Sequence, residues 1–443
     1  MIKDMTEGSP SKIILKFAMP MLLSMLFQQL YNVVDSIVAG KFIGVDALAS
    51  VGASYPITML FIAIATGASV GCCIVISQLF GAKRLAKMKS AISTAIISLV
   101  SLSIILMLIG VIICNPLMRL IDTPADIFAT SALYLRVYIF GIGFLFLYNT
   151  ATAVFTGLGD SQTPLYFLIF SSLLNIALDL LFVIKFKMGV SGVAWATFIA
   201  QGISSILAIS YLMIRVKKIE VEEEYKKFDP VILKRMGKVA IPSIMQQSFI
   251  SVGQLCVQGL INSYGPDVIA GYSSAFKVNT FAVTSMGTIS NALSSFTAQN
   301  IGARKLDRVK QGYKAAMAVA AVFCAIIVTC FLVFGREVIG FFVDTATGKN
   351  VIDVGLQFLL IVTPCYPIVM LKVVSDGVLR GAGDMGEFMV TTFTDLLLRV
   401  IFSYILSRFI GFTGICWAFP IGWVIGTALS VYYYFNGNWK RII

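Results

Sequence analysis

A group of polar side chains interrupts an apolar stretch near the amino-terminal end of the sequence. If residues 13–38 form a helix, one face of it carries Gln28, Tyr31, Asn32 and Asp35, spaced at i, i+3, i+4 and i+7. Leucine and valine cover most of the other faces. A carboxylate at membrane depth costs about 2.5–3.5 kcal/mol on insertion scales, so Asp35 predicts a functional site. A polar contact between helices is the structural alternative.

A second carboxylate lies in a later apolar run, residues 163–184. Asn175 and Asp179 are four residues apart, so on a helix they share one face. Asp35 and Asp179 would repel each other if both were ionised in one bundle, and a bound proton or a small hard cation would relieve that repulsion. The pattern therefore predicts a proton or sodium site, with oxygen ligands from Asp35, Asn175 and Asp179.

The composition places these residues in a membrane. The chain has 443 residues, of which 58% are hydrophobic and 13% are charged, far too apolar a balance for an ordinary soluble protein. Apolar runs of about twenty residues or more recur along it, the length needed to cross a hydrocarbon core of about 30 Å as a helix. The first run follows Lys12 and Lys16 without a small-residue cleavage site, which favours a retained spanning helix. We therefore expect an all-α integral membrane protein.

Several functional classes are disfavoured. The net charge of +12 comes largely from short loops between apolar runs, so it does not predict a nucleic-acid surface. The eight cysteines form no CxxC pair and histidine is absent, which disfavours a zinc site or a disulfide framework. No nucleophile with a base and no GxxxxGK[ST] loop can be identified, so neither an enzyme nor an ATP-driven pump is expected, and no cofactor is implied.

The apolar runs predict twelve membrane helices, six in each half of the chain. They lie near residues 13–38, 48–77, 90–114, 131–156, 163–184, 190–214, 233–261, 268–298, 310–334, 353–379, 386–409 and 412–435.

The two halves repeat each other at a spacing close to 221 residues. The repeated segments are Lys16–Pro20 with Lys238–Pro242, Gln78–Lys83 with Gln299–Arg304, Gly157–Asp160 with Gly381–Asp384, and Gly189–Gly192 with Gly411–Gly414. Because each copy holds an even number of helices, the copies are predicted to be parallel repeats that enter the membrane from the same side. We expect a lobe over residues 1–214, a cytoplasmic linker over 215–230 and a second lobe over 231–443.

The basic residues predict the orientation in the membrane. Clusters of Lys and Arg fall in loops on one side, chiefly in 83–89, 215–238 and 304–310, and the loops of the other side hold far fewer. Cytoplasmic loops are enriched in Lys and Arg, so both termini are expected in the cytoplasm of a multi-pass cell-membrane protein.

The second half differs chemically from the first. Its first helix carries the amides Gln254 and Gln258 where the first half has Asp35. Asp395 and Arg399 are four residues apart, a spacing that favours an internal ion pair. Lys372, Asp376 and Arg380 share one helix face and either line a second cavity or neutralise one another. Pro20 and its counterpart Pro242 lie inside helices, where proline permits either a hinge or a static kink.

Across essentially its full length the chain resembles the multidrug and toxic compound extrusion (MATE) family of secondary transporters. The twelve helices in two repeats carry the resemblance, together with Pro20, Tyr31–Asp35, Gly81–Lys83, Gly157–Asp160 and Asn175–Asp179. The first-half acids look like the DinF-like branch, in which a first-lobe cavity with Asp and Asn residues is proposed to bind protons or sodium. By that resemblance the candidate coupling and cavity residues are Gln28, Tyr31, Asp35, Asn149, Asn175, Asp179 and Thr197.

We therefore expect a bacterial, monomeric antiporter that exports small lipophilic cationic drugs or dyes by alternating access, in exchange for protons or sodium. Its only other partner would be membrane lipid. The expected substrate cavity comprises Gln28, Tyr31, Asn32, Asn149, Gln254 and Gln258, with Pro20 as a hinge. The alternative is a flippase for an anionic lipid-linked precursor of the same superfamily, which should present several Arg or Lys residues to its cavity. The first-half acids favour cationic cargo instead.

Overall fold

The computed structural model describes residues 3–38, 42–43, 45–121, 123–341 and 349–441, and within these ranges the regular structure is helical, with no strand. The helices of the first half are α1 (Pro10–Val38), α2 (Val45–Gly81), α3 (Leu85–Leu120), α4 (Ala125–Phe140), α5 (Ile142–Gly157), α6 (Gln162–Leu180) with the π-helix η2 (Leu181–Lys185), and α7 (Val190–Lys217). Those of the second half are α8 (Pro230–Ile261), α9 (Pro266–Gly302), α10 (Leu306–Gly340), α11 (Lys349–Val362), α12 (Tyr366–Ala382), α13 (Met385–Ile410) and α14 (Phe412–Asn436). Short 3₁₀ turns complete them: η3 (Asn262–Tyr264), η4 (Thr363–Cys365) and η5 (Asn438–Arg441).

Each of the twelve predicted segments coincides with one helix or with a joined pair. The segment predicted at 131–156 is a pair, α4 and α5, bent by 45° at Gly141, a residue of low helix propensity. The segment predicted at 353–379 is also a pair, because η4 contains Pro364, which lacks the N–H that would continue α11. Within the described ranges, nine helical segments, or ten with the bent pair, are long and apolar enough to span a membrane. The predicted all-α membrane fold is confirmed.

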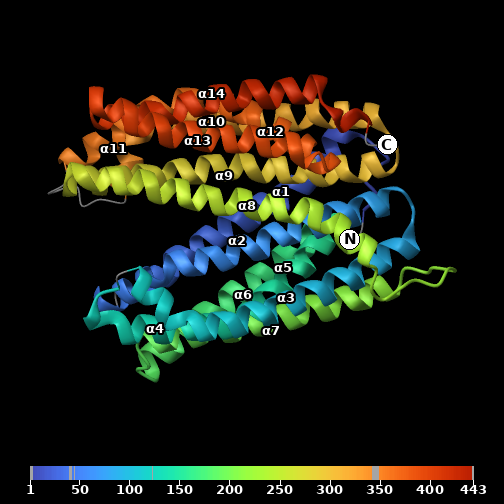
Figure 1. Ribbon diagram of the computed structural model, residues 1–443, viewed down its shortest axis with the longest axis horizontal. Helices are drawn as coiled ribbons and strands as arrows, with labels where there is room; N and C mark the ends of the chain where they lie inside the picture. Colours follow the sequence, from blue (N-terminus) through green and yellow to red (C-terminus); the bar gives the residue numbers. More distant parts are fainter. Residues whose placement is uncertain (1–2, 39–41, 44, 122, 342–348, 442–443) are drawn as a thin grey trace. The chain divides into compact units, whose positions relative to one another are not determined.

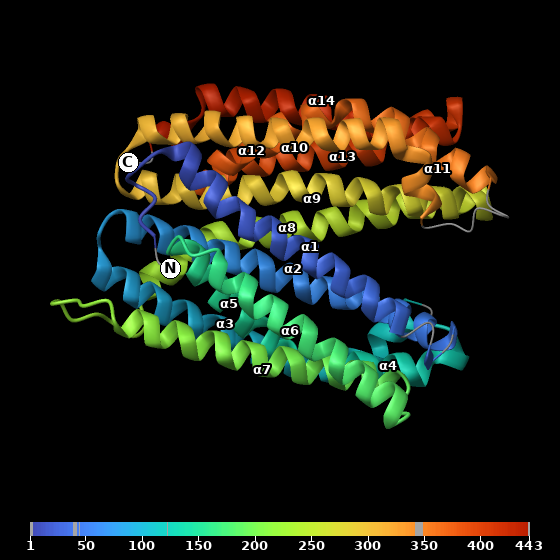
Figure 2. The same cartoon turned by 180° about the vertical axis from the view of Figure 1, so that it is seen from behind.

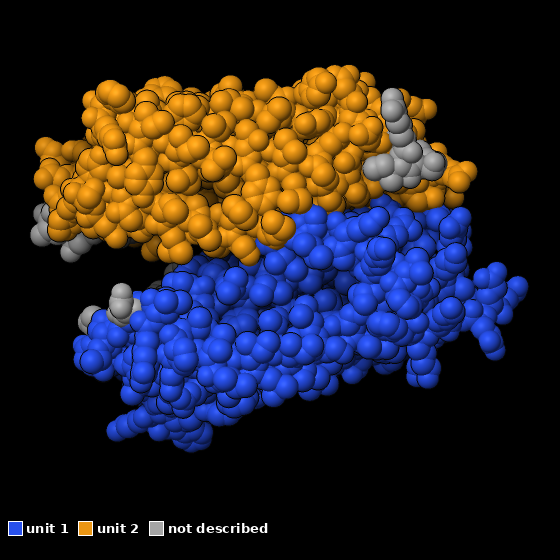
Figure 3. Space-filling model, viewed as in Figure 1, with its two compact units in different colours: residues 1–4, 19–244 blue, residues 5–18, 245–443 orange. Residues whose placement is uncertain are grey.

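The chain divides into two compact units, coloured separately in Figure 3. The first unit comprises residues 1–4 and 19–244, and the second comprises 5–18 and 245–443. The divisions fall inside α1, next to Pro20, and inside α8, two residues after Pro242. Between α7 and α8, residues 218–229 form no helix. The predicted lobe boundaries and the cytoplasmic place of the 215–230 linker stay a prediction.

The internal repeat is visible in the backbone of the turns. Three pairs of counterpart residues adopt matching left-handed conformations: Lys83 and Arg304 both have φ 58°, Gly159 and Gly383 have φ 79° and 85°, and Gly189 and Gly411 both have φ 60° and ψ −141°. The hydrogen bonds match as well, since Asp160 N donates to Phe155 O at 2.8 Å and Asp384 N donates to Leu379 O at 2.9 Å. The repeated motifs therefore build the same turns in both halves.

The helices of each unit lie side by side (Figures 1 and 2). Glycines in the repeated motifs allow some of them to pack closely. A Cβ atom on Gly157 of α5 would lie 3.1 Å from the carbonyl oxygen of Cys73 on α2. Its counterpart on Gly381 of α12 would lie 2.3 Å from the carbonyl oxygen of Ser294 on α9. Close backbone contact explains the glycine at this point of both repeats.

Asp160 follows Gly159 and starts α6. Its Oδ1 accepts hydrogen bonds from the backbone N–H groups of Gln162 and Thr163 at 3.2 and 3.1 Å, and its Oδ2 accepts one from the Thr163 hydroxyl at 2.8 Å. Burial by itself raises the pKa of Asp160, but the hydrogen bonds that the carboxylate accepts outweigh burial and lower the pKa below its ordinary value. The carboxylate is thereby held ionised at the amino-terminal end of α6, where negative charge is favourable.

Candidate functional site

The first unit brings three of the predicted site residues together. Asn175 and Asp179 lie one turn apart on α6, at 2% and 0% exposure. With the Asn175 amide turned to satisfy its partners, Nδ2 lies 2.8 Å from Asp179 Oδ2. Oδ1 then accepts from the backbone N–H and the hydroxyl of Thr197 on α7, at 3.1 and 3.2 Å. The Asn175 side chain thus connects the buried carboxylate to the neighbouring helix.

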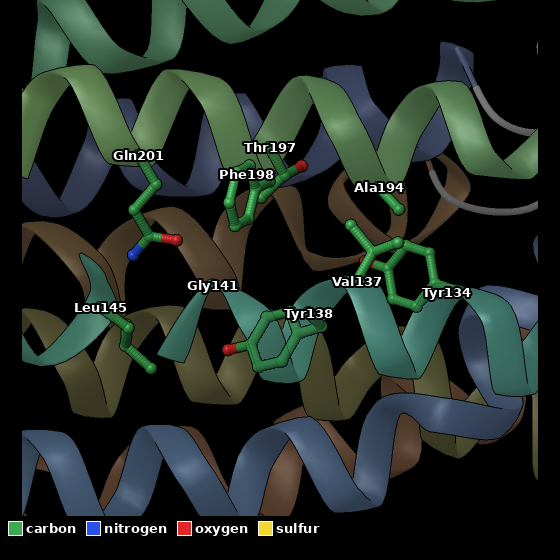
Figure 4. Close-up of a pocket in the computed structure, with 9 residues that line it drawn as sticks. All are labelled: Tyr134, Val137, Tyr138, Gly141, Leu145, Ala194, Thr197, Phe198 and Gln201. Atoms are coloured by element: carbon green, nitrogen blue, oxygen red, sulfur yellow. The ribbon is translucent and has the colours of Figure 1, made fainter. Parts of the chain in front are cut away.

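A pocket opens beside this group, with Thr197 as its shared wall (Figure 4). Helix α7 contributes Ala194, Thr197, Phe198 and Gln201, and the facing wall consists of Tyr134, Val137, Tyr138, Gly141 and Leu145 from α4, α5 and the bend between them. The lining is therefore largely aromatic and apolar, and its polar groups are the hydroxyls of Thr197 and the two tyrosines and the amide of Gln201.

The other predicted site residues of the first half lie on α1 and α5. Asn32 and Asp35 lie in α1, but their side chains fall outside the described residues, so the predicted contact of Asp35 with Asp179 stays a prediction. Gln28 is exposed and Tyr31 is half-buried on the same helix. Asn149 on α5 donates from Nδ2 to Leu145 O of its own helix at 2.9 Å.

Pro20 is buried in α1, which is helical from Pro10 to Val38, and its carbonyl accepts a hydrogen bond from the Ser24 hydroxyl at 2.9 Å. The predicted hinge role of Pro20 stays a prediction.

The second unit contains a buried network of four charged side chains. The predicted ion pair is confirmed, because Arg399 Nη2 lies 3.1 Å from Asp395 Oδ1 on α13. Lys372 Nζ on α12 lies 2.8 Å from Asp376 Oδ2 and 3.8 Å from Asp395 Oδ2. Arg380 Nη2 donates to Asn291 Oδ1 on α9. The sequence left two interpretations of the charged residues on α12, namely that they line a cavity or that they neutralise one another. Lys372 and Asp376 neutralise each other.

Hydroxyl groups and glycines complete the network. Asp376 Oδ1 accepts hydrogen bonds from the hydroxyls of Ser430 on α14 and Thr391 on α13, at 2.7 and 3.1 Å. On α14, a Cβ atom at Gly422 would lie 2.8 Å from Asp395 Oδ1, and one at Gly426 would lie 2.9 Å from Lys372 Cε. The absence of side chains at both positions leaves room for the charged groups between α12, α13 and α14.

A second pocket lies beside this network in the same unit. It is lined by Ile250, Gly253, Gln254, Val257, Tyr272, Phe276, Leu396, Arg399, Val400 and Phe419. Gln254, a predicted cavity residue, is one of its walls. Gln258, the other predicted amide, is not among them and donates from Nε2 to Asn262 Oδ1 at 2.9 Å.

Sequence reasoning missed the aromatic wall of the first pocket and the link between Lys372 and Asp395. Gln201 could have been found, because it is four residues after Thr197 and so shares its helix face. The Lys372–Asp395 contact joins two helices, and spacing within one helix carries no signal for such a contact.

The repeated all-helical fold and its buried polar groups define a multi-pass membrane protein of the transporter type. The MatE family model matches residues 20–181 and 242–405, one match in each half of the chain, so the chain belongs to the MatE family.

Relatives and solved structures agree with this assignment. The probable multidrug resistance protein YpnP of Bacillus subtilis (strain 168) is 28% identical over 441 residues, which cover 99% of this chain and 98% of that protein. The multidrug export protein MepA of Staphylococcus aureus (strain MSSA476) is 21% identical, over 94% of this chain and 91% of its own. A structure described as an outward-facing conformation of a multidrug resistance MATE family transporter of the MOP superfamily superposes with a TM-score of 0.90 at 22% identity, covering 99% of this chain and 97% of that one.

Proposed function

We propose that this chain is a secondary antiporter that exports small lipophilic organic cations in exchange for protons or sodium. The observation that carries the proposal is the fully buried Asp179, held by the Asn175 amide, which in turn contacts Thr197. An ionisable group in a membrane helix is costly and by default functional. The names of the relatives YpnP and MepA, which describe multidrug resistance and export, support the same class of cargo.

Competition at the Asp179 carboxylate would couple the two fluxes. A proton or a sodium ion at these oxygens neutralises the charge, and a neutral site holds a cationic cargo more weakly. Each ligand shifts the equilibrium between outward and inward states only by its differential affinity for them. In this mechanism Asp35 would complete the site from α1, Asn175 and Thr197 would orient it, and Pro20 would let α1 change shape.

The pocket in Figure 4 suits the cargo of this mechanism. Tyr134, Tyr138 and Phe198 present aromatic surface beside Thr197, and aromatic faces attract organic cations with a strength of about 0.5–2 kcal/mol each. We therefore place the apolar part of a lipophilic cation in this pocket, with its charge directed to the carboxylate. Gln28, Tyr31, Asn32 and Asn149 would extend the cavity.

Transport in reconstituted vesicles tests the proposal. We expect efflux of a fluorescent cationic dye to follow an imposed pH gradient or an imposed sodium gradient, because either ion can neutralise the site. Applying each gradient separately identifies the coupling ion. Dye flux that is the same with and without both gradients would contradict antiport.

Resistance profiles provide a second prediction. Expression in a drug-sensitive host should raise the tolerated concentration of cationic dyes and drugs about tenfold or less, as expected for one added efflux route, and should leave anionic compounds unaffected, since an acidic site disfavours anions. Growth inhibition assays measure both. Protection confined to anionic compounds would instead favour the flippase for anionic lipid-linked precursors.

The membrane orientation provides a third prediction. We expect single cysteines placed in the 83–89 and 304–310 loops to resist an impermeant thiol reagent added to intact cells, because these basic loops should face the cytoplasm. Labelling should appear once the membrane is permeabilised. Modification of either loop from outside would reverse the proposed orientation of both termini.

A further inference from the structure

The pocket of the second unit is lined by a guanidinium, whereas the group around Asp179 contains a carboxylate. Among the residues that line it, Arg399 carries the one charged side chain, while Tyr272, Phe276 and Phe419 supply aromatic walls. Asp395, the ion-pair partner of Arg399, and Asp376 are each about 6% exposed and are not among the lining residues. The pocket therefore presents one side of an ion-paired guanidinium together with aromatic rings.

The internal repeat shows that this pocket is the counterpart of the first-unit site. Phe419 follows Gly411 at the same distance as Thr197 follows Gly189, and these two glycines adopt identical turns. Gln254 likewise follows Pro242 at the same distance as Asn32 follows Pro20. Arg399 follows Asp384 at the same distance as Asn175 follows Asp160, so the second unit has a guanidinium where the first unit has the amide that holds Asp179.

The guanidinium of Arg399 has hydrogen-bonding capacity left. Among the described residues, only its Nη2 bonds to Asp395, at 3.1 and 3.3 Å, and its buried Nε has no acceptor. Aromatic rings hold the group in place, because its central carbon lies 4.8 Å from the Phe419 ring centre and 5.9 Å from that of Trp423. A planar donor group of this kind suits a carboxylate.

We propose that the second-unit pocket binds the carboxylate group of planar aromatic compounds. The carboxylate accepts hydrogen bonds from Arg399, the ring packs against Phe276 and Phe419, and the Gln254 amide provides a further donor at the rim. Binding alone does not depend on the proposed antiport.

Equilibrium binding to the purified full-length protein in detergent tests this site without any ion gradient. The probes are three ligands of one shape, namely naphthoate, naphthamide and naphthylmethylamine. We expect naphthoate to bind about tenfold more tightly than the neutral amide, because hydrogen bonds between charged groups are stronger than neutral ones. Equal affinity for naphthoate and naphthamide would overturn the proposal.

The Gln254→Glu variant tests whether naphthoate binds in this pocket. Gln254 is exposed, so the variant should fold, and its new carboxylate competes with the ligand for Arg399. We expect about a tenfold loss of naphthoate affinity with little change for naphthamide. Gln247→Glu is the matched control, since it makes the same change on an exposed residue of α8 about 10 Å along the helix. Equal loss in both variants, or no loss in Gln254→Glu, would place the ligand elsewhere.

Arg399→Lys tests the guanidinium itself. Lysine keeps the positive charge beside Asp395 but lacks the planar group and its Nε, so naphthoate affinity should fall several-fold while the naphthylmethylamine affinity stays the same. An unchanged naphthoate affinity would exclude Arg399 as the carboxylate ligand. Because no gradient is involved, failure of these tests is distinct from failure of cation export, which the vesicle assay measures.

Discussion

Replacing Asp179 by Asn is expected to abolish gradient-driven export while leaving the protein folded. The change keeps the size of the side chain and removes the ability to be ionised, so the site stays permanently in the neutral state that a proton or sodium ion would otherwise create. The coupling of cargo release to ion entry is then lost, and we expect efflux to fall at least about tenfold. Vesicle transport under the preferred gradient, with size-exclusion chromatography as the test of folding, measures the effect.

The matched control is Asp126→Asn. Asp126 is an exposed carboxylate in the first turn of α4, in the same unit, and the same substitution there should leave export unchanged. Export at the wild-type rate by the Asp179→Asn protein would refute the proposed role of this carboxylate.

Asp35 should act together with Asp179. If Asp35 and Asp179 share one coupled site, Asp35→Asn should lose as much export as Asp179→Asn, and the double variant should lose little more than either single one, because residues that act as a unit are not additive. Losses that multiply in the double variant would mean that the two carboxylates act independently.

The Asn175–Asp179 part of the site could be predicted from the sequence because both residues lie on one helix. Their spacing of four, inside an apolar run, is enough to place them on a common face, and the structure adds the distance between them. Thr197 lies on the next helix, and only the resemblance to the MATE family pointed to it. The helices themselves were predictable because long apolar runs can cross a membrane in few other ways.

Features that depend on contacts between helices could not be predicted in the same way. The 45° bend at Gly141 creates the facing wall of the first pocket, and a single glycine in a helical pattern does not fix the size of a bend. The Asp395–Arg399 ion pair was predicted correctly, because both residues lie on one helix. The sequence does not reveal that Arg399 also lines a pocket, whereas Asp395 is not among the lining residues.

Replacement of Lys372 should give the largest loss of folding stability. The Lys372 and Asp376 side chains are only 7% and 8% exposed, and Lys372 is the cation shared by Asp376 and Asp395. Lys372→Met leaves two buried carboxylates with Arg399 alone, and an uncompensated buried charge costs about 3–5 kcal/mol. We expect the unfolding midpoint in detergent to fall by about 10 °C, taking about 2–4 °C per kcal/mol for a large domain.

The double variant Lys372→Met with Asp376→Asn separates charge from packing. It restores a neutral network, and the hydroxyls of Thr391 and Ser430 can still donate to the amide oxygen at position 376. We therefore expect more than half of the lost thermal stability to return. The control is Lys310→Met, which breaks the exposed pair with Asp307 on α10 and should cost about 1 kcal/mol or less. If Lys372→Met were no more destabilising than Lys310→Met, or if the double variant were less stable than the single one, the four charged groups would not form the interdependent network that their distances indicate.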